Sequence, residues 1–167
     1  MNIINRIQAM KKMKLLLKRL KYIYREDSIN LLEMHLSFRI DLFYELQTSM
    51  TFEESYVDIL TFVSPIILEP ESETYYRVIE LVNYIQWYIK GFGRMYVDNE
   101  GNIAYSLRFK YSFLESNSEM VLDEYQTCID YYSDLFTIIH DVAKRKIDVD
   151  DGMKLIDEIW GKETFNE

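Results

Sequence analysis

The chain has 167 residues and a formal net charge of −9, with 49% hydrophobic and 15% aromatic residues. This apolar content excludes general disorder, and a single cysteine excludes an internal disulfide framework. No apolar run approaches the ~20 residues that span a bilayer, and the N-terminal residues lack the pattern of a secretory signal. The sequence therefore predicts one cytoplasmic domain over residues 1–167.

The first 25 residues are the most basic part of the chain. They hold eight of the 19 Lys and Arg residues and none of the 28 Asp and Glu residues. Apolar residues at helical spacing, from Ile3 through Met10 and Leu17 to Tyr24, predict an amphipathic helix within residues 1–27. Packing of this helix on the acidic remainder is the favoured interpretation. The alternative is binding to an anionic membrane surface or to nucleic acid.

Strand periodicity is clearest from Met34 to Leu46. Every second residue in this stretch is apolar, and most residues between them are polar. The pattern predicts a strand with one buried face. Because the stretch is longer than a usual strand, we expect a bulge or bend within it.

A further strand is predicted over residues 56–63, where both faces are apolar. One face carries valine and isoleucine, and the other carries Tyr56, Leu60 and Phe62. Helices covering both sides of the sheet are the favoured explanation. The alternative is a partner-binding or dimer surface built from Tyr56, Leu60 and Phe62.

The segment 70–111 switches from helical to strand periodicity. Apolar residues from Val78 to Tyr88 recur at spacings of three and four, which predicts one helix. Gly91 and Gly93 are expected to end that helix, because glycine readily adopts the left-handed conformation that follows a helix.

A hairpin is predicted directly after these glycines. Residues 94–97 form a short strand, and 98–102 supply turn residues. The second strand alternates apolar and polar residues as far as Tyr111.

The C-terminal third reads as two helices. Residues 116–119 have the form of a capping box, and an apolar stripe follows from Val121 to Val142. Asp148 is expected to cap a shorter last helix that ends at Gly161.

No pattern that indicates catalysis or metal binding is present. Cys128 lies on the apolar stripe of a helix, where a thiol is usually a small core residue. His35 and His140 do not form a metal-ligand spacing. The segment 91–93 lacks the further residues of a phosphate-binding loop, and 148–159 places its glycine wrongly for a calcium loop. The sequence predicts a protein that is not an enzyme and has no catalytic, cofactor-binding or metal-binding residues.

Three segments, at 62–72, 81–85 and 93–105, resemble the YbjN-like domain family. They are a strand that ends near a proline, a helix with a Val-Asn pair, and a short strand that ends in aspartate and opens a hairpin. The resemblance is good over about residues 60–111 and loose as far as about 140. It implies a fold like that of type III secretion chaperones and a role as a bacterial sensory transduction regulator. It implies no catalytic residues.

These observations predict an α+β domain, a small antiparallel sheet flanked by helices in the order α-β-β(-β)-α-β-β-α-α. Residues 1–27 form the basic helix, 28–145 the YbjN-like core, and 146–167 a short helix and tail. The predicted function is a non-enzymatic, cytoplasmic adaptor, regulator or chaperone-like domain that binds another polypeptide, with homodimer formation. The alternative function is an anionic-surface binder that uses the basic helix.

Overall fold

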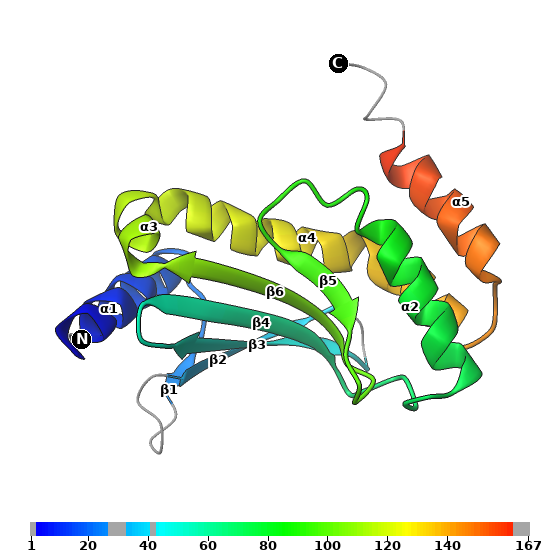
Figure 1. Ribbon diagram of the computed structural model, residues 1–167, viewed down its shortest axis with the longest axis horizontal. Helices are drawn as coiled ribbons and strands as arrows, with labels where there is room; N and C mark the ends of the chain where they lie inside the picture. Colours follow the sequence, from blue (N-terminus) through cyan, green and yellow to red (C-terminus); the bar gives the residue numbers. More distant parts are fainter. Residues whose placement is uncertain (1–2, 27–32, 41–42, 162–167) are drawn as a thin grey trace.

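The computed structural model describes residues 3–26, 33–40 and 43–161 of the chain (Figure 1). Its helices are α1 (Ile3–Arg19), α2 (Glu73–Ile85), α3 (Tyr111–Ser116), α4 (Ser118–Ala143) and α5 (Val149–Trp160). Its strands are β1 (Arg25–Glu26), β2 (Glu33–Arg39), β3 (Glu45–Phe52), β4 (Tyr56–Ser64), β5 (Arg94–Val97) and β6 (Ile103–Lys110).

The strands of the described residues form one antiparallel sheet in the order β1-β2-β3-β4-β6-β5. Each strand pairs antiparallel with its neighbours. β4 and β6 are adjacent although α2 and β5 separate them in the sequence. The predicted α+β class is confirmed.

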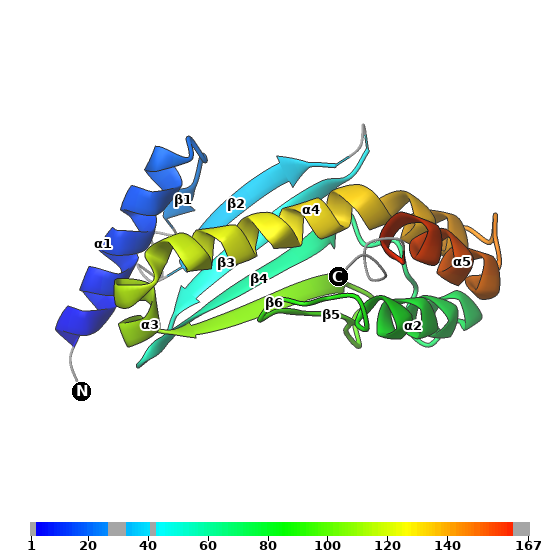
Figure 2. The same ribbon diagram turned by 90° about the horizontal axis from the view of Figure 1, so that it is seen from above.

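The helices are gathered on one side of this sheet. α4 runs along one face, with α1 and α3 near one end and α2 and α5 near the other (Figure 2). Every second residue of β3 and β4 is buried under this layer, including Leu46, Met50 and Ile59. The apolar stripe of α4 from Val121 to Val142 is buried against them, which confirms the predicted helix and its buried face.

Tyrosines of α4 satisfy buried polar groups of the sheet. The Thr48 hydroxyl lies 2.9 Å from both the Thr61 hydroxyl and the Tyr125 hydroxyl. The Tyr132 hydroxyl lies 3.1 Å from the Thr61 carbonyl oxygen and 3.0 Å from that of Ile103. Because an unpaired buried polar group is costly, these bonds fix the position of α4 along the sheet.

The single strand predicted from Met34 to Leu46 is wrong. β2 ends at Arg39 and β3 begins at Glu45, and these two residues pair across a turn. An even number of positions separates them, so the period-2 pattern passes through the turn without interruption. Periodicity alone therefore could not reveal that the expected bend is a complete reversal.

The basic helix packs on the rest of the protein, as favoured above. Met13 and Leu17 of α1 are buried in the shared core, and the Arg19 guanidinium pairs with Glu119 of α4. This hydrogen bond lowers the pKa of Glu119. The predicted extent to residue 27 is wrong: α1 ends at Arg19, and Lys21 follows with a φ of 61°.

The predicted end of α2 at the two glycines is also wrong. α2 begins after Ser72, whose side chain caps its N-terminus, and ends at Ile85. The role of Gly93 is close packing, because a Cβ atom at this position would lie 2.0 Å from the ring of Tyr105.

The predicted hairpin is confirmed as β5 and β6. Gly101 in its turn has a φ of +86°, and a Cβ atom there would also meet the carbonyl oxygen of Leu68. Tyr111, which alternation assigned to the second strand, is instead the first residue of α3.

The capping box at residues 116–119 is not formed. Ser116 is the last residue of α3 and donates to the Ser112 carbonyl oxygen at 3.0 Å, while Asn117 precedes α4 without a side-chain cap. Asp148 precedes α5 as predicted, but it makes no cap bond and instead pairs with Arg77 at 2.5 Å.

Candidate functional site

The face of the sheet that points away from the helices is the first candidate site. We call it the open face and define it by the outward residues of β3, β4, β6 and β5. Tyr56, Leu60 and Phe62 lie on it and are half-buried. Leu60 pairs with Ser49 and Ser106, and Tyr96 of β5 adds a ring that is 38% exposed. The three residues predicted for partner binding therefore share one surface.

Coverage of both faces by helices, the favoured expectation for residues 56–63, is wrong for the described part of the chain. The described helices all lie on the other side of the sheet (Figure 1). Tyr56, Leu60 and Phe62 are half-buried, because only the neighbouring side chains of the sheet shield them from solvent.

The charges of the open face are mixed and paired. Arg108 donates to Asp58 through Nε at 2.6 Å and through Nη2 at 3.0 Å, and its guanidinium lies 4.4 Å from the centre of the Tyr56 ring. The hydrogen bonds with Asp58 raise the pKa of Arg108. This cation stacks on the aromatic ring and is held there by the carboxylate.

The balance of charge differs between the two sides of the molecule. The charged side chains that pairing and alternation place on the open face, among those described, are Glu45, Asp58, Arg94, Arg108 and Lys110. Basic residues there outnumber acidic ones by three to two, and Arg108 and Asp58 pair with each other. On the other side, α4 carries six Asp and Glu residues and neither Lys nor Arg.

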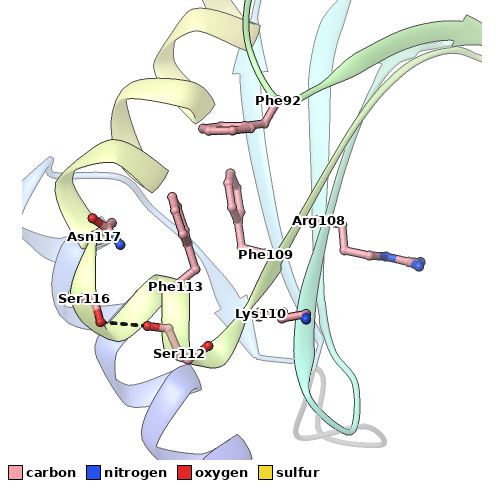
Figure 3. A pocket seen from close by; sticks show the side chains of 8 residues that line it. All are labelled: Phe92, Arg108, Phe109, Lys110, Ser112, Phe113, Ser116 and Asn117. Atoms are coloured by element: carbon pink, nitrogen blue, oxygen red, sulfur yellow. Dashed lines mark hydrogen bonds between the residues drawn. The ribbon is translucent and has the colours of Figure 1, made fainter.

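A pocket at the end of β6 is the second candidate site (Figure 3). The rings of Phe109 and Phe113 stack at 5.6 Å with an interplanar angle of 10°. Phe92 meets both of them edge to face at 6.2 and 5.9 Å. The pocket has a volume of about 530 Å³, which is within the range of ligand sites. Its lining residues are Phe92, Arg108, Phe109, Lys110, Ser112, Phe113, Ser116 and Asn117.

The loop before β5 forms one wall of this pocket. The Phe92 N–H donates to the Glu124 carboxylate at 2.8 Å, which ties the loop to α4. Phe92 is 58% exposed and lines the pocket. Sequence reasoning missed this site, because it read the segment 91–93 only as the end of a helix. An aromatic residue between two glycines was the available signal.

Cys128 and the histidines, the candidate catalytic side chains of the sequence, are not brought together in the described residues. Cys128 is buried, and burial raises the pKa of its thiol to about 12. His140 lies on the same helix, about 18 Å further along its axis from the residue spacing, so the two cannot form a pair. The side chain of His35 lies outside the described residues. No group of three His, Cys, Asp or Glu residues that could hold a metal lies within the described ranges.

Comparisons with protein-family models, curated proteins and solved structures find no match to this chain. The resemblance to the YbjN-like family and the chaperone-like detail of the fold therefore stay predictions.

Proposed function

We propose that this protein is a cytoplasmic, non-enzymatic adaptor or regulator that binds another polypeptide on its open face. The observation that carries the proposal is the absence of any described helix over Tyr56, Leu60 and Phe62. Aromatic and aliphatic residues grouped in the middle of an uncovered sheet are typical of protein interfaces.

The chemistry of the open face favours a particular partner. Full burial of a Leu or Phe side chain contributes about 1.5–3 kcal/mol, so the half-buried groups here contribute part of that on association. Arg94 and Lys110 lie on the same face. We therefore infer a partner segment that is apolar at its centre and acidic at its rim. The six acidic residues of α4 lie on the helical side, away from this face.

A second copy of this chain is a less suitable occupant of the same face. An isologous dimer would bring the basic residues of one open face against those of the other. The homodimer expected from the sequence stays a prediction, and light scattering of wild type and Leu60→Asp tests it. A dimer that Leu60→Asp dissociates would contradict an acidic partner as the occupant.

The main test compares charge substitutions on the two sides of the molecule. Leu60→Asp and Phe62→Asp should leave the circular dichroism spectrum unchanged. Both substitutions should abolish retention of the partner from lysate, and they should also abolish binding of the partner once it has been purified. Leu155→Asp is the control, because Leu155 is a leucine that is 38% exposed on α5, a helix far from the open face. Retention by Leu60→Asp equal to that by Leu155→Asp would contradict the proposal, as would unfolding of Leu60→Asp.

A second candidate function is binding of an anionic membrane surface by α1. The solvent side of this helix carries Lys11 and Lys18 around Leu15, which is 66% exposed, and Ile23 beyond the helix is 90% exposed. Exposed apolar side chains among lysines suit a lipid surface better than nucleic acid, because they add burial to charge attraction. No helix in the described ranges is long and apolar enough to cross a membrane.

The test of this candidate uses vesicles that contain phosphatidylserine. Deletion of residues 1–25 would remove the buried Met13 and Leu17 and so destabilise the fold. The informative variant is Leu15→Glu, which changes only the solvent side of α1. Binding that weakens with salt and is lost in Leu15→Glu would support the membrane role, and binding by neither protein would exclude it.

A further inference from the structure

One edge of the sheet ends unevenly. β5 pairs with β6 only along Ile103–Ser106, whereas β6 continues to Lys110. Phe92, just before β5, is tied to Glu124 of α4, so the chain turns toward the helices instead of following β6. Within the described residues, Arg108 and Lys110 thus have a partner strand on the β4 side alone.

The backbone groups of alternate residues at the end of β6 point toward the unpaired edge of the sheet. The Tyr111 N–H donates to Ser55 on the β4 side, and backbone directions alternate along a strand, so those of Phe109 also face β4. The Met95 N–H donates to the Gln86 side chain, away from β6. The backbone groups of its neighbours Arg94 and Tyr96 therefore face β6, where these residues pair with Ser106 and Ala104. By the same alternation, Arg108 and Lys110 direct their N–H groups, and Arg108 its carbonyl, toward the unpaired edge.

The phenylalanine pocket lies directly beside these groups. The Phe109 side chain faces the helices and forms part of the pocket with Phe92 and Phe113, while the side chains of Arg108 and Lys110 point away from it (Figure 3). In a paired strand, residues opposite each other share a face. A strand added at this edge would therefore insert the side chain opposite Phe109 into the pocket, with its neighbours beside Arg108 and Lys110.

We propose that this edge binds an extended polypeptide segment by strand addition, with an aromatic side chain of the segment in the phenylalanine pocket. The side chains of Arg108 and Lys110, beside which the neighbours of the inserted residue would lie, are both basic, so the aromatic residue is flanked by acidic residues. Backbone bonds supply affinity and the pocket supplies selectivity, as in other cases of strand addition. This site lies at the edge of β6 and shares Arg108 and Lys110 with the open face, but its binding does not require Leu60 or Phe62.

The probe for this proposal is the capped peptide Thr-Val-Glu-Phe-Glu-Val-Thr with an N-terminal fluorescein. Its sequence reads the same in both directions, so it presents the same residues in a parallel or an antiparallel pairing. Fluorescence polarisation should show saturable binding to wild type. A peptide with serine in place of the phenylalanine should bind at least about tenfold more weakly, since the loss of one large apolar contact is worth more than 1.4 kcal/mol.

The decisive variant is Lys110→Pro, with Lys110→Ala as its matched control. Both remove the ammonium group, but only proline removes the edge N–H. Lys110 has a φ of −64°, which proline adopts without strain. We expect Lys110→Pro to bind the probe at least about tenfold more weakly than Lys110→Ala. Phe92→Ala should also weaken binding, and Leu60→Asp should not.

Equal binding by Lys110→Pro and Lys110→Ala would overturn strand addition, as would the absence of binding to wild type. Loss of binding in Leu60→Asp would place the peptide on the open face and would also overturn this proposal. If Lys110→Pro does not fold, amide exchange in wild type answers the question. Strand addition requires the Arg108 and Lys110 amides to become protected when the probe binds, and their unchanged exchange would contradict it.

Discussion

The two faces of the sheet use the same strands under different constraints. On the covered face, Met50 and Ile59 are fully buried, and the hydroxyl of Thr48 bonds to Tyr125 of α4. On the open face, Leu60 is half-buried, and Asp58 pairs with Arg108 across the strands. Each residue of β4 thus differs from its neighbour in what surrounds it.

This difference separates residues that maintain the fold from residues that are available for binding. A covered side chain has close neighbours in α4, so a change of its size or charge lowers the free energy of unfolding. An open side chain has neighbours only in its own sheet, so a change there affects mainly what can dock. Paired substitutions at adjacent positions of β4 test this comparison directly.

The largest effect is expected from aspartate on the covered face. Ile59→Asp places an unpaired carboxylate in the core and should lower the free energy of unfolding by more than about 4 kcal/mol, enough to unfold a marginal domain. Leu60→Asp, one residue along, keeps its carboxylate in water and should cost at most about 1–2 kcal/mol. Urea denaturation followed by circular dichroism measures both. Similar losses for the two variants would contradict the assignment of an open face.

A thiol on each side of the sheet provides the second test. Burial raises the pKa of the Cys128 thiol to about 12, so its reactive thiolate is scarce at pH 8 and increases only as the pH rises toward that value. In Leu60→Cys, the new thiol lies on the open face. We expect iodoacetamide at pH 8 to label the new thiol in the folded protein and to leave Cys128 unmodified, as measured by peptide mass spectrometry. Labelling of Cys128 at a comparable rate would show that α4 does not protect the covered face.

The smallest effect is expected from the ion pair of the open face. Asp58→Asn removes the charge that holds Arg108 and should lower the free energy of unfolding slightly, because exposed pairs contribute little. The loss should shrink as salt is added. Asp134→Asn on the solvent side of α4 is the matched control. A large, salt-independent loss for Asp58→Asn would show that this face is more enclosed than described.

Periodic segments were predictable, and the points where the chain reverses were not. The α4 stripe from Val121 to Val142 and the hairpin of β5 and β6 were predicted because local period and turn residues agree there. The turn between Arg39 and Glu45 was missed because alternation continues through it. The end of α2 was predicted wrongly because Gly93 was interpreted as a helix stop. Its role is instead to accommodate the ring of Tyr105, a contact between residues distant in the chain.

The candidate sites divide in the same way. Tyr56, Leu60 and Phe62 were identifiable, since apolar residues on both faces of one strand are visible in the sequence. The phenylalanine pocket was not, because Phe92, Phe109 and Phe113 come from three elements and meet only in the folded protein. Its unpaired strand edge depends on where β5 leaves the sheet, and the Glu124 contact that directs this departure is also tertiary.

The sequence by itself determined the α+β class, the amphipathic helices and which residues of β4 share a face, because these follow from local periodicity. Only the tertiary structure decided that the described helices gather on one side, that basic residues outnumber acidic ones on the open face, and that the last residues of β6 lack a partner strand on one side. Those features depend on strand order and on contacts such as Arg19 with Glu119, which join residues far apart in the chain. Periodicity carries no information about which face a distant helix will cover.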